Sequence, residues 1–172
     1  DFTQVNGLFR DRLARLNADG TLDTTFDLGQ GVNESVRAIS VQPDGRALLA
    51  GFFTSVNGRS RNGIARLNYD GSVDGTFNPG GGADNPVHDV LLQPDGKVII
   101  VGDFASYNGY NRSRVARLNN DGTLDKGFDI GTGADLLVSS VALQPDGKIL
   151  IGGDFAHFNG KPLAGIARLN AD

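Results

Sequence analysis

The chain repeats itself every 51 residues, and this periodicity limits its fold more than any other feature of the sequence. The tetrapeptide ARLN begins at Ala14, Ala65, Ala116 and Ala167. The tetrapeptide QPDG recurs at the same spacing, as does the pattern FxxxNG, in which x is any residue. Several independent motifs in one register, without insertions, predict a repeat architecture in which each unit packs against its neighbours.

Three complete repeats and a partial one fill the 172 residues. We expect a single β-propeller region over 1–172, divided into a partial repeat (1–19), a first repeat (20–70), a second repeat (71–121) and a third repeat (122–172). Three repeats and a fraction cannot close a ring, because propellers have at least four blades. Since the chain starts and ends inside a repeat, we expect an excerpt of a longer protein; the alternative is an assembly of several chains.

Short β-strands account for each repeat. In the second repeat one apolar stretch, 87–93, precedes Pro-Asp-Gly and another, 97–101, follows it. Pro fixes φ, Asp bonds to the local backbone and Gly supplies a positive φ, so this arrangement predicts a hairpin. A third strand is predicted through VARLN, and a fourth, shorter one at 124–128.

Four antiparallel strands per repeat, without any helical periodicity, predict the blade of a β-propeller. Nineteen of the twenty acidic residues are aspartate, which favours turns over helices and agrees with an all-β fold. The alternative is an open β-solenoid, whose strands are usually parallel.

The repeat resembles the bacterial delta-60 type of β-propeller repeat. The resemblance rests on QPDG, the Asn-Gly pair and ARLN followed by an Asp-Gly turn, and it covers the whole chain. Phe52 departs from the pattern, because the corresponding residues are Asp103 and Asp154. Proteins with this repeat are typically large secreted or surface proteins of bacteria, and the repeat has no assigned catalytic activity. The resemblance therefore implies a secreted or cell-surface module for binding, adhesion or structural support.

Composition argues against several classes of partner. The net charge of −4 provides no basic surface, so we expect no nucleic acid. The absence of cysteine removes disulfides, thiolate metal sites and a cysteine nucleophile. The sequence has no run of about eighteen apolar residues, so we expect no membrane insertion.

One arginine recurs inside the third predicted strand of each repeat, and an aspartate follows eight residues later in all but the last. The arginines are Arg15, Arg66, Arg117 and Arg168, and the aspartates are Asp23, Asp74 and Asp125. An arginine flanked by apolar residues needs a partner for its charge, so the pattern predicts a buried bidentate pair that holds each blade together. The alternative is a ring of arginines that binds an anion on the propeller axis.

The segments of the form N-x-D-G-x-x-D, such as 17–23, resemble the middle of an EF-hand loop. However, arginine at the first ligand position repels a cation, and no bidentate glutamate follows. A bulged hairpin turn explains the same residues, so Ca²⁺ is disfavoured and we expect no metal or other cofactor. The glycine run 80–82 lacks the Lys-Ser/Thr that completes a phosphate-binding loop.

Catalytic chemistry has few candidates in this sequence. His88 and His157 are the only histidines, and neither has a recurring carboxylate or hydroxyl partner, so we assign no catalytic residue and expect no enzyme. The alternative is a propeller enzyme of the glycosidase or lyase type, which would use acids that differ between blades. These acids are Glu34, Asp84, Asp89 and Asp135.

The segment between FxxxNG and ARLN varies most between repeats, reading LFRDR, RSRNG, YNRSR and KPLAG in order. Shared residues maintain the fold, so a partner is expected to contact this variable segment, and tyrosine and arginine are the residue types that carry interface energy. We predict a protein- or glycan-binding surface made of Tyr107, Tyr110, Asn111, Arg112, Arg114, Arg59, Arg61 and Asn62. The alternatives are a solvated loop and self-association through unpaired sheet edges.

Overall fold

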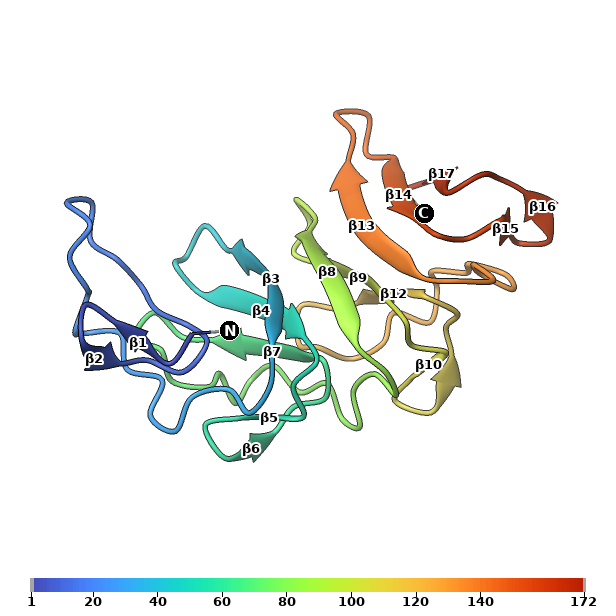
Figure 1. The fold of residues 1–172 in the computed structure, drawn as a ribbon. Coiled ribbons are helices and arrows are strands. Elements are labelled where there is room, and N and C mark those ends of the chain that lie inside the picture. Colours follow the sequence, from blue (N-terminus) through green and yellow to red (C-terminus); the bar gives the residue numbers. More distant parts are fainter. Residues whose placement is uncertain (1, 172) are drawn as a thin grey trace.

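The computed structural model describes residues 2–171, which form β-strands and turns without any helix (Figure 1). Each complete repeat builds one three-stranded antiparallel sheet with its second strand in the middle. The three sheets contain β3 (Val36–Val41), β4 (Ala47–Gly51) and β7 (Ile64–Leu67); β8 (Val87–Leu92), β9 (Val98–Gly102) and β12 (Val115–Leu118); and β13 (Val138–Leu143), β14 (Ile149–Gly153) and β17 (Ile166–Leu169). Within residues 2–171, no helix could cross a membrane.

The Pro-Asp-Gly turn joins the first two strands of every sheet, as the sequence predicts. In the second repeat, Gln93 N donates to Lys97 O (2.8 Å), and Gly96 at the bend has a φ of +84°. Asp95 Oδ1 accepts a hydrogen bond of 3.1 Å from Lys97 N, which fixes the bend. These aspartate and lysine positions therefore serve the hairpin turn.

A second, much smaller hairpin follows the middle strand of each sheet, and the partial repeat contains a further copy of it. These four tip hairpins pair β1 (Gln4–Val5) with β2 (Leu8–Phe9), β5 (Ser55–Val56) with β6 (Arg59–Ser60), β10 (Ser106–Tyr107) with β11 (Tyr110–Asn111), and β15 (His157–Phe158) with β16 (Lys161–Pro162). Every bend is an Asn-Gly pair with positive φ at both residues, for example +48° at Asn108 and +78° at Gly109. This is the type I′ turn, which suits two-residue hairpins. From the sequence this segment is expected to be a loop, so the hairpin is a finding of the structure.

The expected fourth strand is present only as a one-residue bridge, for example between Leu67 and Val73. The turn before it is the bulged hairpin expected from N-x-D-G, because Asn68 N donates to Ser72 O (2.8 Å) and Gly71 has a φ of +92°. Beyond the bridge, Asp74 Oδ1 accepts from Thr76 N (2.8 Å), which turns the chain away from the ladder. The local Asx turn thus ends the strand.

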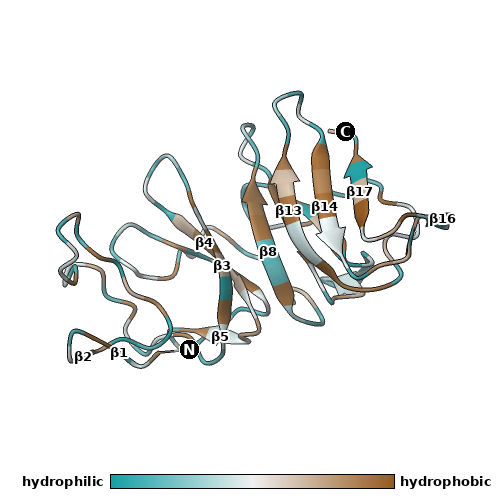
Figure 2. Cartoon of the chain, turned by 45° about the horizontal axis from the view of Figure 1, so that its top comes forward, coloured by the Kyte–Doolittle hydropathy of each residue, from teal (hydrophilic) through white to brown (hydrophobic). Residues whose placement is uncertain are grey.

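The three sheets stand in a row, with their first strands β3, β8 and β13 adjacent (Figures 1 and 2). Val141 N on β13 donates a hydrogen bond of 3.0 Å to Asp89 Oδ2 on β8, which joins two of these strands directly. Neighbouring first strands and antiparallel pairing within each sheet are the features of propeller blades and not of a parallel β-solenoid. The chain is an all-β segment of a β-propeller, and within residues 2–171 the row of blades is open.

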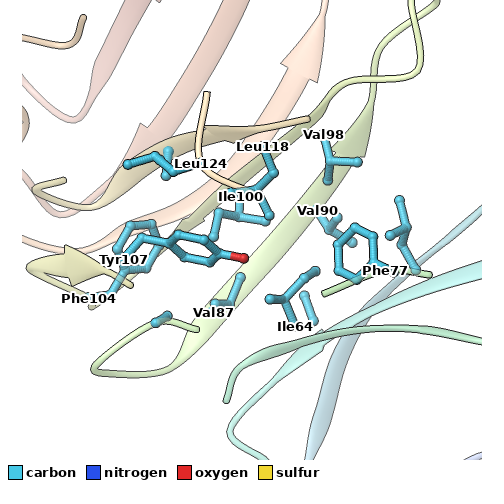
Figure 3. Packing of buried hydrophobic residues seen from close by; sticks show 14 residues of the cluster. Ile64, Phe77, Val87, Val90, Val98, Ile100, Phe104, Tyr107, Leu118 and Leu124 are labelled. Atoms are coloured by element: carbon cyan, nitrogen blue, oxygen red, sulfur yellow. The ribbon is translucent and has the colours of Figure 1, made fainter. Parts of the chain in front are cut away.

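The hydrophobic core consists of three clusters: one between the first and second sheets, one between the second and third sheets, and one between the partial repeat and the first sheet. In the cluster between the first and second repeats, Ile64 packs with Val87, Ile100 and Tyr107 (Figure 3). Ile99, the neighbour of Ile100 on β9, belongs to the next cluster along the row. Because successive side chains of a strand point to opposite faces, both faces of β4 and β9 are buried, which explains their continuous apolar runs.

The two end faces of the row leave apolar side chains exposed. Ile39 on β3 is 51% exposed, whereas Val90 at the same position of the second repeat is 6% exposed. At the other end, Ile166 on β17 is 61% exposed, whereas Ile64 at the same position of the first repeat is fully buried. The residues exposed on each end face therefore correspond to residues that pack against a neighbouring blade elsewhere in the chain.

Candidate functional site

The tip hairpins carry the side chains that differ most from one repeat to the next. Their backbones are the same in all four copies, because each is built on the same Asn-Gly turn. The two residues after the turn are Leu8 and Phe9, Arg59 and Ser60, Tyr110 and Asn111, and Lys161 and Pro162. All eight are exposed. One scaffold thus presents four different pairs of side chains.

Tyr110 is the largest of the predicted binding residues that reach solvent, with 45% of its surface exposed. Lys126 Nζ donates a hydrogen bond of 2.8 Å to its hydroxyl oxygen and lies 4.3 Å from the centre of its ring. This hydrogen bond lowers the pKa of Tyr110. Lys126 was missed by the sequence analysis, although it stands where the other repeats have Thr24 and Gly75. Tyr110, Asn111 and Arg59 are the predicted binding residues that are exposed, and Lys126 adds to them.

Tyr107 does not belong to that surface, which corrects the prediction. It is fully buried among Phe104, Ile100 and Val87 (Figure 3), and its hydroxyl donates a hydrogen bond of 2.8 Å to Gly122 O. Burial raises its pKa far above the ordinary value. Tyr107 is therefore a core residue whose polar atom has an internal partner.

The remaining predicted binding residues are half-buried and bond mainly to the chain itself. Arg61 and Arg112 each donate from Nη1 to the preceding carbonyl oxygen (2.8 Å). Arg114 donates from Nη1 to Asp103 O (2.7 Å), and its backbone has a φ of +70°. Asn62 Nδ2 donates to Gly81 O (2.8 Å). The structure thus assigns these four side chains mainly to bonds within the fold.

The recurring arginines and aspartates meet at the junctions between blades. Arg66 Nε donates to Asp74 Oδ2 (2.7 Å), and Arg117 and Arg15 make the same contact with their own aspartates at 2.8 Å. The pair is not bidentate as predicted, because the guanidinium divides its other donors. Arg66 Nη2 donates to Thr76 Oγ1 (3.2 Å) and Nη1 donates to Asn120 O in the next repeat (2.7 Å). Its Cζ also lies 5.0 Å from the ring centre of Phe77.

These arginines lie on the third strand of each sheet, away from the first strands that are adjacent in the row. A ring of arginines on the axis is therefore the wrong interpretation of the pattern.

Burial raises the pKa of Asp125, but hydrogen bonds from Lys97 and Arg117 outweigh it and lower the pKa to about 2. Hydrogen bonds from Thr25, followed by one from Arg15, lower the pKa of Asp23 to about 2. Arg168 is exposed and has no ion pair among residues 2–171.

The N-x-D-G segments use their carboxylates within the turn. Asp121 Oδ1 accepts hydrogen bonds from Thr123 Oγ1 (2.6 Å) and Thr123 N (3.0 Å), and these bonds lower its pKa. Asp19 and Asp70 do the same in their repeats. Across residues 2–171, no group of three His, Cys, Asp or Glu side chains is arranged to hold a metal ion.

The acids that differ between blades also have local partners. Asp84 Oδ1 accepts from Ala105 N (2.9 Å) and Ser106 N (3.0 Å), and so fixes the start of a tip hairpin. Asp135 makes the same bonds in the third repeat, and the amide oxygen of Asn33 makes them in the first. Since asparagine serves equally well, the shared function of this position is to accept hydrogen bonds.

Each histidine lies near one carboxylate. His157 Nδ1 is 2.9 Å from Asp135 Oδ2, and both side chains are exposed. His88 Nε2 is 3.5 Å from Asp103 Oδ2, and its ring meets Phe52 edge-on with 5.3 Å between ring centres. Neither pair lies beside a serine, threonine or second acid in a triad-like arrangement among the described contacts, so no catalytic geometry is assigned to them.

Comparison with known proteins agrees with this architecture. The family model described as "Domain of unknown function (DUF5122) beta-propeller" matches residues 1–26, 42–77, 93–128 and 144–172. Each internal match runs from QPDG to the phenylalanine that contacts the recurring arginine of the same match (Phe77 with Arg66, Phe128 with Arg117), so it crosses the boundary between two sequence repeats. No curated protein matches the chain. With most of its length matched by this model, the chain belongs to the DUF5122 β-propeller family.

Proposed function

We propose that the chain is a non-catalytic binding module that presents its tip hairpins to a protein or glycan partner. The observation that carries this proposal is the contrast within each repeat: the blades share their buried residues, whereas the exposed residues after each Asn-Gly turn differ. Residues that differ on a common scaffold are where binding specificity resides in repeat proteins.

The proposed contact surface centres on Tyr110 and Asn111 of the second repeat and Lys126 of the third, with Arg59 of the first repeat at the position that matches Tyr110. The phenol ring of Tyr110 offers an apolar face for a sugar ring or an aliphatic side chain. Lys126 and Asn111 offer hydrogen-bond donors beside it, and Arg59 offers others on the tip hairpin of the first repeat. Aromatic and cationic side chains together are the composition that carries interface energy.

The proposed setting is a secreted or cell-surface bacterial protein, in which the module mediates adhesion or provides structural support. This setting rests on the resemblance of the repeat to the delta-60 type. The proposal involves no cofactor, nucleic acid or membrane insertion, and the net charge of −4 is consistent with a partner other than nucleic acid.

The test is a screen of the purified chain on a glycan array and against bacterial surface proteins, followed by variants. Tyr110→Ala is expected to weaken binding to any hit by roughly tenfold or more, as truncation of a central tyrosine does at other interfaces. Lys148→Ala is the matched control, because it removes an exposed side chain in a Pro-Asp-Gly turn at the opposite end of a blade. Equal losses for the two variants would contradict the proposed surface.

A second candidate is self-association through the end faces of the row. It is favoured by the exposure of Ile39 and Val41 at one end and of Ile166 at the other. These faces correspond to the two sides of an internal blade junction, so a second copy of the chain could stack onto them. Light scattering over a range of concentrations tests this candidate, and a monomer at the highest concentration would exclude it.

A further inference from the structure

A groove of about 630 Å³ lies at the junction between the first and second repeats. One wall comes from the end of β4 and from Asn62 and Gly63, the residues before β7. The other wall comes from the loop 81–86 and from the tip hairpin of the second repeat. The volume is within the range of sites that hold small molecules or single side chains.

Gly63 stands in the groove where two other repeats have an arginine. Arg12 occupies the position in the partial repeat and Arg114 in the second, with φ values of +63° and +70° against +71° at Gly63. All three backbones are thus left-handed, which glycine adopts freely and arginine only at some cost. The arginines are accommodated in spite of this cost. The same backbone conformation therefore occurs with an arginine side chain at Arg12 and Arg114 and with none at Gly63.

The two arginines identify the atoms that a guanidinium meets at such a junction. Arg12 Nη1 donates to Val32 O (2.8 Å) and Asp11 Oδ1 (2.7 Å), and Arg114 Nη1 donates to Asp103 O (2.7 Å). At the junction with Gly63, the corresponding residues are Ala83, Asn62 and Phe52, and all three line the groove. Among the described residues, the main-chain oxygens of Phe52 and Ala83 and the Oδ1 atom of Asn62 accept no hydrogen bond. Three residues that line the groove therefore each carry an acceptor without a donor among residues 2–171.

The charges around the groove favour a cation. Asp84 lines it, is exposed and forms no ion pair among residues 2–171; its carboxylate accepts hydrogen bonds from the main-chain NH groups of Ala105 and Ser106 and interacts with the Ser106 side chain. Arg37 lies nearby, but its Cζ is stacked 4.5 Å from the ring centre of Phe52. His88 meets the same ring at its edge. The Phe52 ring is thus covered by Arg37 and His88. The acceptor oxygens of Phe52, Asn62 and Ala83 are the part of the groove left for a ligand.

We infer that this groove binds the guanidinium group of an arginine side chain from a partner protein or peptide, in the place that Arg12 and Arg114 fill at the other junctions. A guanidinium suits the site better than an ammonium because its planar fork directs five donors toward acceptors on both walls. The tip hairpin of the second repeat contributes to one wall, but none of Tyr110, Asn111 and Lys126 lines the groove, so the inference is independent of binding at those three residues.

The direct test is titration of the chain with N-acetyl-arginine N-methylamide, followed by ¹H–¹⁵N NMR. We expect saturable shifts of the amide signals of Gly63, Ala83 and Asp84, with a dissociation constant in the millimolar range. The citrulline analogue has the same shape without the charge, and the lysine analogue has the charge without the fork. Both are expected to bind at least about tenfold more weakly, because charge-assisted and bidentate hydrogen bonds are the strong ones.

Gly63→Arg places an arginine side chain of the chain itself in the groove and is expected to abolish binding of the probe. An added Cβ would lie 2.7 Å from Val87 Cγ2, but Arg12 and Arg114 face a valine at the same position (Val36 and Val138), so the substitution is expected to fold. Gly165→Arg is the matched control, since it makes the same change in the third repeat, which does not border this groove. It should leave binding unchanged, as should Tyr110→Ala.

Two further variants make the inference independent of Gly63→Arg. Asp84→Asn keeps the oxygen that fixes the tip hairpin, as Asn33 does in the first repeat, and should weaken binding about threefold through loss of an exposed charge. Arg114→Gly should create a second site for the probe at the next junction. Equal binding of the citrulline or lysine analogue, or undiminished binding by Gly63→Arg, would overturn the inference, as would the absence of any saturable shift.

Discussion

Arg66 in the first repeat donates a hydrogen bond of 2.7 Å to the main-chain oxygen of Asn120 in the second. The same guanidinium pairs with Asp74 in its own blade and stacks on Phe77. One side chain therefore ties its own sheet to the turn of the next blade. The contact recurs between Arg117 and Ala171, so the recurring arginine joins blades to one another as well as strands within a blade.

Removal of this arginine is expected to destabilise the chain strongly. The side chain of Arg66 is 3% exposed and that of Asp74 is 5% exposed, so Arg66→Ala leaves a buried carboxylate whose remaining cation is the half-buried Arg46, 3.1 Å away. Loss of one partner of a buried pair costs about 3 kcal/mol or more. Urea denaturation followed by circular dichroism measures the change. Arg168→Ala is the control, expected to cost less than about 0.5 kcal/mol because Arg168 is exposed; similar losses for both would contradict the prediction.

Acid is expected to destabilise the chain through the same aspartates. The pKa of Asp125 falls from 3.8 to about 2 in the folded state, since hydrogen bonds from Lys97 and Arg117 outweigh the effect of burial. Its carboxylate therefore stabilises the fold fully above pH 3.8, and this contribution is lost as the pH falls toward about 2. The urea midpoint should decrease over this interval.

Asp125→Asn should flatten that pH profile, because it removes one of the groups that titrate differently in the folded and unfolded states. Asp154→Asn provides the comparison, since Asp154 is exposed and forms no ion pair within residues 2–171. If the stability of Asp125→Asn depends on pH as steeply as that of the parent chain, other groups control the acid response.

Equivalent isoleucines at an internal junction and at an end face should differ in their effect on stability. Ile64→Ala removes a fully buried side chain between two sheets and is expected to cost about 3 kcal/mol. Ile166→Ala changes the same position of the third repeat, where the side chain is 61% exposed, and should cost less than about 0.5 kcal/mol. Comparable costs would indicate that the end face is covered in solution, which light scattering would then detect as association.

The two tyrosines of one tip hairpin should separate stability from binding. Tyr107→Phe removes the donor to Gly122 O and leaves that acceptor buried, so it should cost about 1 kcal/mol of stability without affecting a partner at the surface. Tyr110→Ala should have the opposite profile, with little change in the urea midpoint and weaker binding. Loss of binding in Tyr107→Phe at unchanged stability would place the contact surface elsewhere.

The strands and turns of the blades could be predicted because each depends on local residues. Pro-Asp-Gly and N-x-D-G occur between apolar runs, and both form the expected bends. The tip hairpins carry the Asn-Gly pair, the strongest short signal for a type I′ turn, but strands of two residues are too short for a periodic pattern to be recognised. As a result, the sequence does not separate Tyr107, which points into the core, from Tyr110, which points outward.

The contacts across the junctions could not be predicted from one repeat, because they depend on how the blades stack. The eight-residue spacing indicates the pair of Arg66 and Asp74, but nothing in either repeat alone indicates that Asn120 completes it. The same holds for Gly63 and Arg114. In the sequence both belong to a variable segment, and only the stacked blades show that one leaves open the space that the other fills.

The bond from Arg66 to Asn120 spans 54 residues, three more than the repeat, and this overlap affects how the gene for such a chain can grow or shrink. Excision of residues 71–121 would join Asp70 to Gly122 and place Arg66 eight residues before Asp125 and 54 before Ala171. Arg66 would then have an aspartate and a main-chain oxygen at the same separations as before, so both of its contacts could form with new partners. Unequal recombination that removes or adds 51 residues preserves these arginine contacts wherever the breakpoint falls. The contacts depend only on the separation of the residues along the chain.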